Sequence, residues 1–426
     1  MTAAKASSTN RRNLKNVILL IFCGSFLLSV SIVNASAAPV DRTYSCGSLR
    51  SMARIYMASG GYEKAQPFLV KALHMAKETN ASDSEVSACM LDLAYLYKNQ
   101  GRLAEAERTC RSGLELQEKA YSQSHPYVAY TLRILSEIYR NQARYREAAE
   151  TLERAIIIMR EFTLEDDQEL APFNVDMARL LAAQGDYVKA ESYFKNAIAS
   201  IENNYGPDHL YTSRVLSSMA ALYVLQQRYD EAKELISRAL PIQERIYGPD
   251  HHFLVTAWLV KSSIYEAEGD LVNTKMLLEK SLDSVENIAG SGHVVECDVL
   301  SRLGELYILS KEYKKAEDIL QRALEILESS NGINTDHAAI TLNSLAKVYI
   351  IQGKYSKARS LCGRALDILE NIFDEYHPNI ADVLETQVQL NHKTGNMAEA
   401  ARLQQRAEEI RVHNKVTYAP IAQAIE

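Results

Sequence analysis

Histidine is the residue type in this 426-residue chain whose spacing comes closest to that of a metal site. Five of the ten histidines are separated by multiples of 42 residues: His125, His209, His251, His293 and His377. A zinc ion holds its ligands at about 2 Å, whereas packed helices lie about 8–10 Å apart. Histidines on successive helical units therefore cannot share one ion. Two of the five precede a proline, which is typical of a helix start, and we predict that this set caps helices or packs in loops.

The cysteines offer a second kind of chemistry, because paired thiols can form disulfides. Cys110 and Cys362 occupy one place in the sequence repeat described below, where other repeats have Leu, Ile or Phe. Cys46 and Cys297 share another place in the repeat, where most other repeats have a small residue. Free Cys behaves as a small buried hydrophobe, so we predict that these four lie in the core. Cys89 and Cys110 are the pair on opposing helices that could meet, and whether they form a disulfide stays open.

Known catalytic patterns are missing from the sequence. It holds no HExxH pair, no CxxC, no Gly-rich phosphate loop and no strand pattern to support one. A net charge of −7 argues against a general nucleic-acid binder, which needs a strongly basic face. We predict a non-enzyme without cofactor or metal. A Ser-His-acid site assembled from separate repeats is the remaining enzymatic alternative.

A repeat of 42 residues positions all of these side chains. Its mark is the residue that follows each polar turn, and after a first gap of 41 the next seven gaps are all 42. Small residues stand three and ten places after the marks, and Tyr stands six places before seven of the nine. The marks are Tyr62, Leu103, Tyr145, Tyr187, Tyr229, Leu271, Tyr313, Tyr355 and Met397.

The repeat predicts helical hairpins. Apolar residues recur at spacings of three and four on both sides of each turn, the small residues allow two helices to cross closely, and the tyrosines fill the holes opposite. One hairpin cannot bury its apolar face alone, so neighbours stack. We predict an all-α fold, a right-handed superhelix (α-α solenoid) of about nine hairpins over residues 44–413, with a C-terminal tail at 414–426.

The first 37 residues do not fit the repeat. Residues 1–15 hold four basic residues and no acid, residues 17–33 are uncharged and mostly apolar, and Ala35-Ser36-Ala37 follows. These are the parts of a secretory signal peptide. We predict cleavage after Ala37 and an exported protein, periplasmic or secreted. The alternative is an uncleaved membrane anchor at 17–33, because that run lies at the short limit for a spanning helix.

The order of Tyr, then Gly-x-Tyr-x-x-Ala, then a small residue resembles the tetratricopeptide repeat. The 42-residue length and the two Tyr-Gly-Pro-Asp-His loops, at 205–209 and 247–251, are similar to the kinesin-light-chain subfamily. The resemblance implies a concave groove, lined mainly by the first helix of each hairpin, that binds segments of other proteins. No heptads precede residue 44, and an export-like segment begins the chain. A cytosolic motor-cargo adaptor is therefore the less favoured alternative.

In the frame of that family, the groove positions carry opposite charges in the two halves of the chain. The last four repeats place mainly acids there, among them Glu266 and Asp298, and Asn343 is what remains of an Asn ladder. Glu137 is the chief acid of the first five repeats, whose groove positions carry Arg50, Arg54, Lys98, Arg133, Arg140, Arg179 and Arg214. Guanidinium groups bind carboxylates bidentately, so this basic half predicts an acidic partner; solvated charges and contacts between repeats are the alternative interpretation.

These patterns favour a protein-protein interaction scaffold that binds a peptide or protein segment, with no nucleic acid partner and a membrane contact only if the N-terminal segment is uncleaved. The alternative from another class is a structural array that associates with itself or serves as a membrane-tethered assembly factor.

Overall fold

The fold was obtained as a computed structural model that describes residues 44–58, 61–163, 168–289, 294–329 and 334–418. The expected signal or anchor segment and His293 lie outside the described residues. The helices are α2 (Cys46–Ala58), α3 (Tyr62–Glu78), α4 (Asp83–Asn99), α5 (Leu103–Ala120), α6 (Pro126–Asn141), α7 (Tyr145–Arg160), α8 (Ala171–Ala183), α9 (Tyr187–Tyr205), α10 (Leu210–Leu225), α11 (Tyr229–Tyr247), the short 3-10 helix η1 (His252–Leu254), α12 (Val255–Ala267), α13 (Leu271–Ala289), α14 (Val294–Leu309), α15 (Tyr313–Ser329), α16 (Asp336–Ile351), α17 (Tyr355–Ile372), α18 (Pro378–Lys393) and α19 (Met397–Tyr418).

The predicted all-α solenoid is confirmed. Helices α2 to α19 form nine successive hairpins, and every repeat mark is the first residue of the second helix of its hairpin. The small residues three places after the marks are all completely buried, from Ala65 in the first hairpin to Ala400 in the last. Their missing bulk is what lets the two helices of a hairpin approach closely. The last helix ends at Tyr418, so residues 414–418 of the expected tail are helical.

The turn inside each hairpin has one repeated backbone conformation. The residue two places before the mark has a positive φ in the eight hairpins from the second onward, between 57° at Ala143 and 84° at Gly185. Five of these eight residues are Gly, which adopts the left-handed conformation without steric cost. Ala143, Gln227 and Lys311 adopt it as well. The constant turn explains why the repeat length stays constant.

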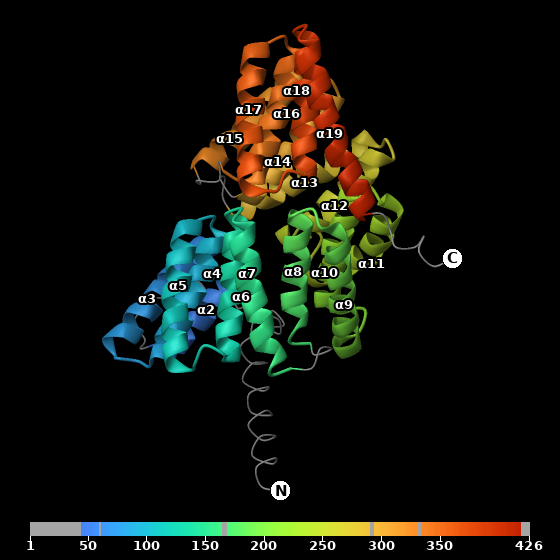
Figure 1. The fold of residues 1–426 in the computed structure, drawn as a ribbon. Helices are drawn as coiled ribbons and strands as arrows, with labels where there is room; N and C mark the ends of the chain where they lie inside the picture. Colours follow the sequence, from blue (N-terminus) through green and yellow to red (C-terminus); the bar gives the residue numbers. More distant parts are fainter. Residues whose placement is uncertain (1–43, 59–60, 164–167, 290–293, 330–333, 419–426) are drawn as a thin grey trace.

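The first helices line the inner side of the solenoid. Each second helix packs against the first helix of the following hairpin, and first helices contact one another, as in α6 with α8 and α14 with α16. Consecutive second helices make no comparable contact in the described part of the chain. A stack whose inner helices are closer than its outer helices must curve, and Figure 1 shows the resulting superhelix.

The C-terminal hairpins of the superhelix return to contact its third and fourth hairpins. In Figure 1 the C-terminal hairpins α14–α19 lie across the ends of α6, α7 and α8. The ring of Phe373, between α17 and α18, stacks on Tyr145 at the start of α7 with centroids 5.0 Å apart. The Nε2 of His377 lies 3.0 Å from the carbonyl oxygen of Ala183, at the end of α8. We call these four residues the closure contact; it joins parts of the chain that are far apart in sequence.

Four of the five histidines that recur at multiples of 42 lie in the described residues, and these four are helix caps, as predicted. His125, His209, His251 and His377 each stand at the N-cap, and the Nδ1 of each accepts a hydrogen bond of 3.2 Å from the backbone N–H two residues later. Each ring also stacks on the aromatic residue four places before it, as in Tyr205 on His209. The set is structural, and the described residues contain no group of His, Cys, Asp and Glu that could hold a metal ion.

These caps predict a dependence of stability on pH. Burial lowers the pKa of all four capping histidines, because a charged ring is disfavoured there and an Nδ1 that accepts a hydrogen bond cannot carry a proton. Their folded pKa lies below the unfolded value of about 6.5, so this stability is present above that pH and is lost as the pH falls. We expect a loss of up to about 1 kcal/mol per cap between roughly pH 7 and pH 5.

Thermal unfolding followed by circular dichroism across that pH range checks the prediction. The variant H125N/H209N/H251N keeps a capping side chain at each position but removes the titration, because Asn is a good N-cap. Its stability should depend less on pH than that of the unchanged protein. It should also be lower overall, because the ring stacking is lost. Equal pH slopes for the two proteins would show that the caps do not titrate as argued.

None of the helices in the described ranges is both long enough and apolar enough to span a bilayer.

Candidate protein-binding surface

Five of the seven basic groove residues, Arg50, Arg54, Lys98, Arg133 and Arg179, lie in a ladder of ion pairs along the inner side. At its N-terminal end the Nε of Arg50 lies 2.6 Å from Asp92, and the Nη2 of Arg54 lies 2.9 Å from the same carboxylate. Both arginines come from α2 and Asp92 comes from α4, so these contacts join the first two hairpins. Asp92 neutralises part of the charge that the sequence assigns to this end of the surface.

The middle of the ladder is more deeply buried. Lys98 on α4 pairs with Glu137 on α6, and the Nη1 of Arg133 on α6 lies 2.6 Å from Asp176 on α8. Arg133 also lies 3.2 Å from Glu137, so it joins the two acids. Burial raises the pKa of Asp176, with repulsion from Glu137 adding to it and Arg133 opposing it. Asp176 is a second acid at the basic half of the groove that the sequence analysis did not count.

An excess of positive charge remains around α6, α8 and α10. Arg179 lies 3.5 Å from Asp176 and donates a hydrogen bond of 2.9 Å to Ser218. Burial lowers the pKa of Arg179, Asp176 opposes this, and the charges of Arg140 and Arg214 lower it further. The positive charge of Arg179 on α8 is therefore repelled by Arg140 on α6 and by Arg214 on α10, the neighbouring first helices. We call Arg140, Arg179 and Arg214 the arginine triad.

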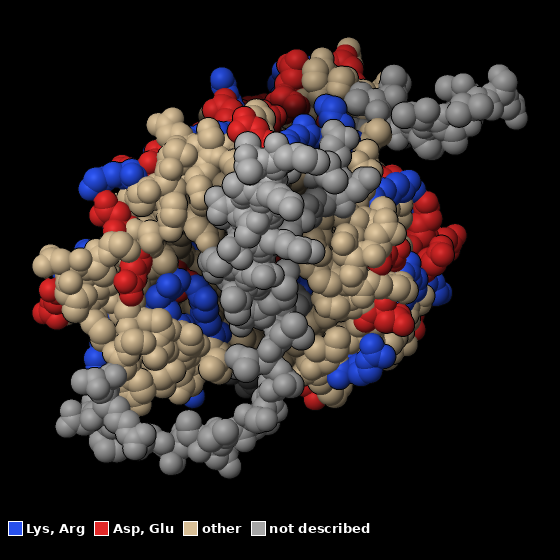
Figure 2. Space-filling model, turned by 90° about the horizontal axis from the view of Figure 1, so that it is seen from below, with Lys and Arg blue, Asp and Glu red and all other residues tan. Residues whose placement is uncertain are grey.

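The triad has fewer acidic contacts than the rest of the ladder. Arg214 lies over the ring of Phe253, 5.7 Å from its centroid, and near the hydroxyl of Tyr247. Arg140 forms no ion pair within 4.0 Å in the described part of the chain. Figure 2 shows Lys and Arg side chains inside a hollow of the face seen from below. A surface on which the guanidinium groups outnumber the carboxylates that pair with them is suited to an anionic group.

The C-terminal half of the inner side is also paired. The Nη2 of Arg302 on α14 lies 3.1 Å from Glu266 on α12, and His337 lies 2.5 Å from Asp298. The negative charge of Asp298 raises the pKa of His337 to about 10, which keeps this histidine charged at neutral pH. Asn343 is buried on α16, and its Oδ1 accepts no hydrogen bond from the described residues.

Apolar side chains extend this surface where first helices end. Leu225 on α10, Leu309 on α14 and Ile351 on α16 are each about half exposed or more. The residues before them, Val224, Ile308 and Ile350, pack into the core. The final residue of each of these helices is therefore the apolar side chain most exposed for contact with a partner.

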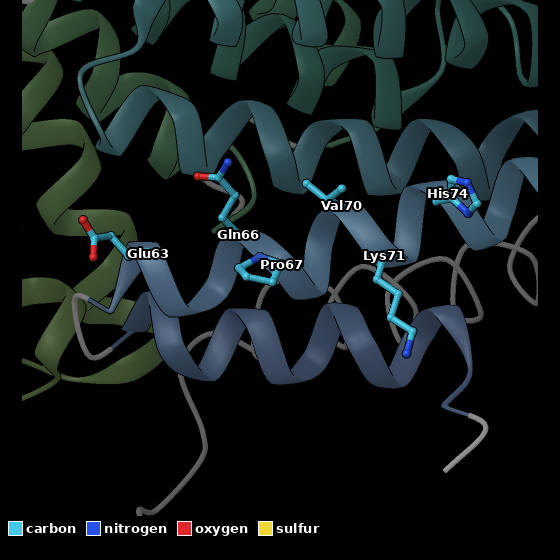
Figure 3. Close-up of a pocket in the computed structure, with 6 residues that line it drawn as sticks. All are labelled: Glu63, Gln66, Pro67, Val70, Lys71 and His74. Carbon is cyan, nitrogen blue, oxygen red and sulfur yellow. The ribbon is translucent and has the colours of Figure 1, made fainter. Parts of the chain in front are cut away.

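A shallow depression outside this surface lies on one helix. Glu63, Gln66, Pro67, Val70, Lys71 and His74 of α3 line it. Figure 3 shows that Glu63, Lys71 and His74 point in different directions and do not converge on one point. Because reacting groups must meet at one place, this depression has no catalytic arrangement.

All five described cysteines are buried, which confirms the core prediction for Cys46, Cys110, Cys297 and Cys362. The thiol of Cys110 donates to the carbonyl of Thr131 at 3.8 Å, whereas the sulfur of Cys89 lies beside that of Cys46. The sulfur contact therefore joins Cys89 to the preceding hairpin rather than to Cys110.

Two family models cover most of the hairpins. Residues 41–209 match the MalT-like TPR region, and residues 214–272, 253–329 and 337–411 match the tetratricopeptide repeat. No curated protein is significantly similar to the chain.

Solved structures share the fold at low sequence identity. A Rap protein complexed with competence and sporulation factor is 16% identical, with a TM-score of 0.55 over 78% of this chain and 99% of that chain. The TPR-like repeats of a Podosopora anserina protein assigned as a kinesin light chain are 21% identical, with a TM-score of 0.39 over 47% of this chain and 95% of that chain. BtubC from P. vanneervenii is 16% identical, with a TM-score of 0.39 over 55% of this chain and 92% of that chain. With nine hairpins of this geometry and both family models matched, the chain belongs to the tetratricopeptide repeat proteins.

Proposed function

We propose that this chain is a non-catalytic scaffold that binds an acidic segment of another protein on its concave surface, with the arginine triad as the anchor. The observation that carries the proposal is the excess of guanidinium groups at Arg140, Arg179 and Arg214, next to a ladder in which the other cations have carboxylate partners. A carboxylate from a partner would supply the missing counter-charge through charge-assisted hydrogen bonds.

Two further observations support the proposal. The exposed ends of α10, α14 and α16 offer apolar contacts beside the charged ladder, and interfaces commonly combine an apolar core with charged recognition. The Rap protein of the same fold was solved in complex with another factor. We further propose that the partner is an exported protein, because the basic and apolar segments at 1–33 have the order of a secretory signal; a membrane anchor at 17–33 is the alternative.

Peptide binding measured by fluorescence anisotropy tests the anchor. The probe is a fluorescein-labelled peptide in which Glu alternates with Leu, and its counterpart with Lys in place of Glu is the negative control. The variant R140Q/R179Q/R214Q should bind the Glu peptide about 100-fold more weakly, because hydrogen bonds to charged groups contribute roughly 1.5–3 kcal/mol each. Raising the salt concentration should weaken binding by the unchanged protein.

The matched control is R146Q/K189Q/K233Q, which removes the same charge from the second helices of the same three hairpins. These side chains are largely exposed on the outer side, so their loss should change the affinity less than threefold. Equal losses in the two triple variants, or equal affinity of the unchanged protein for the Glu and Lys peptides, would contradict the proposal. A molar mass equal to that of one chain, measured by light scattering, would count against the self-associating alternative.

A further inference from the structure

Two cysteines from different hairpins lie in contact at the N-terminal end of the solenoid. Cys46 is the first residue of α2 and Cys89 lies in α4, and their sulfur atoms are 3.1 Å apart. Both are buried, with exposed fractions of 7% and 0%. Disulfide sulfurs are bonded at about 2.05 Å, so a displacement of roughly 1 Å joins them. The packing of α2 on α4 has already brought the two sulfurs together.

Cys297 provides a comparison within the chain. It occupies the same repeat position as Cys46, and each thiol donates to a backbone carbonyl at 3.6 Å, Cys46 to Ala72 and Cys297 to Ala323. At the position equivalent to Cys89 the later repeat has Thr341, whose hydroxyl pairs with that of Ser301 at 2.8 Å. The fold therefore does not require two sulfurs at this place.

We propose that Cys46 and Cys89 form a structural disulfide by exchange with a low-molecular-weight disulfide such as oxidised glutathione. The Cys46 thiol loses its proton and its thiolate attacks one sulfur of the external disulfide, forming a mixed disulfide and releasing one thiolate. The Cys89 thiolate then attacks the Cys46 sulfur, forming the Cys46–Cys89 bond and releasing the second thiolate. The pair loses two electrons and two protons in total, and the external disulfide becomes two thiols.

The order of attack follows from accessibility. Cys46 retains a small exposed fraction and Cys89 has none. Burial raises the pKa of Cys89 to about 12, with its hydrogen bond to Cys46 adding to the effect. Because the thiolate is the nucleophile, exchange in the closed protein is slow. The bond forms readily when the chain folds in the presence of the oxidant.

The disulfide fixes the terminal helix of the solenoid. Among the described residues, helix α2 has a neighbouring hairpin on one side only, and a terminal unit is the least supported part of a repeat array. It also carries Arg50 and Arg54, whose ion pairs with Asp92 begin the ladder. A bond from Cys46 to Cys89 holds α2 on α4 and keeps that end of the ladder assembled. This role does not depend on the proposed binding of an acidic segment.

Oxidative refolding tests the proposal. The purified full chain is unfolded in guanidinium chloride with a reductant and refolded with reduced and oxidised glutathione. Free thiols are then alkylated, and non-reduced peptides are mapped by mass spectrometry. We expect a cross-linked peptide that contains Cys46 and Cys89, with a mass lower by two hydrogen atoms than the sum of the separate peptides. The variant C110S should keep the cross-link, and C89S should lose it.

Hydrogen exchange supplies a second readout of the refolded chain. The amides of α2 should exchange roughly 30- to 1,000-fold more slowly in the oxidised than in the reduced protein, since a native disulfide typically contributes about 2–4 kcal/mol. The amides of α17 should not change. Alkylation of both Cys46 and Cys89 after oxidative refolding, or a cross-link from Cys89 to Cys110, overturns the proposal. The peptide map of the unchanged protein decides this even if C89S fails to fold.

Discussion

Replacing Arg133 with Met is expected to lower the free energy of unfolding by about 3–5 kcal/mol at neutral pH. The Arg133 side chain is mostly buried, 2.6 Å from Asp176 and 3.2 Å from Glu137. Its removal leaves two buried carboxylates close together without the cation that joins them. Breaking a buried pair at one partner costs more than the pair contributes, because the remaining charge stays desolvated.

The pH dependence of the loss of stability in R133M tests whether the buried carboxylates cause it. Arg133 opposes the rise in the pKa of Asp176, so in R133M this pKa rises further above its unfolded value. A raised folded pKa gives stability that is present at low pH and lost as the pH rises through it. The deficit of R133M should therefore shrink as the pH falls from about 7 to 5. Urea unfolding at several pH values measures both effects.

The control is R146M in the same hairpin, because the Arg146 side chain is 91% exposed and pairs with Glu150 at the surface. It should change the free energy of unfolding by no more than about 0.5 kcal/mol. The double variant R133M/D176L should recover part of the loss, because it removes one of the two carboxylates that lose Arg133, while Glu137 keeps its pair with Lys98. If R133M and R146M unfold at the same urea concentration, the ladder does not have the structural role described.

The sequence predicted the hairpins because their determinants are local. The marks, the small residues and the capping histidines recur at a fixed spacing, and each reports on contacts within one hairpin or between neighbours. The phenol of Tyr223, six places before a mark, reaches Glu191 of the preceding hairpin at 3.1 Å. Such contacts follow from the spacing of the repeat, so they can be predicted without knowing how the hairpins stack into a superhelix.

The charge balance of the groove was harder to predict. Arg133 and Arg179 were both assigned to a binding surface by their repeat positions, but the structure gives Arg133 two carboxylates and Arg179 one distant one. The difference arises because Asp176 lies at a different repeat position from Glu137 and reaches back to the preceding hairpin. Which cation remains in excess depends on side-chain directions between helices, which the spacing does not contain.

The closure contact was not predictable from the repeat either. Phe373 and Tyr145 meet only because the accumulated rotation of the hairpins returns the chain to its third repeat. The repeat does not distinguish Tyr145, because it is a mark like Tyr187 and Tyr355. In the structure Tyr145 is only 5% exposed, whereas the other two are partly exposed. The additional burial comes from the distant loop.

Removing the closure contact is expected to open the ring. One ring stack and one hydrogen bond together contribute about 1–3 kcal/mol, which corresponds to a preference for the closed form of roughly 5- to 150-fold. In the double variant F373A/H377N the stack is lost, and the shorter Asn side chain still caps α18 without reaching Ala183. We expect the population of the open form to rise by that factor, while the buried Tyr145 keeps its hydrogen bond to Asp336.

Small-angle X-ray scattering measures this change as a larger radius of gyration, with the helix content by circular dichroism unchanged. The control is Y376A, which removes an aromatic ring from the same loop. Tyr376 stacks on His413 of the last hairpin, with centroids 4.2 Å apart, and takes no part in the closure contact. Its scattering should match that of the unchanged protein.

The closed ring limits how a long partner segment can enter the concave surface, so F373A/H377N should also bind the Glu peptide faster than the unchanged protein. Identical scattering of the double variant and Y376A would show that the stacking of neighbouring hairpins sets the closed shape and that Phe373 only follows it.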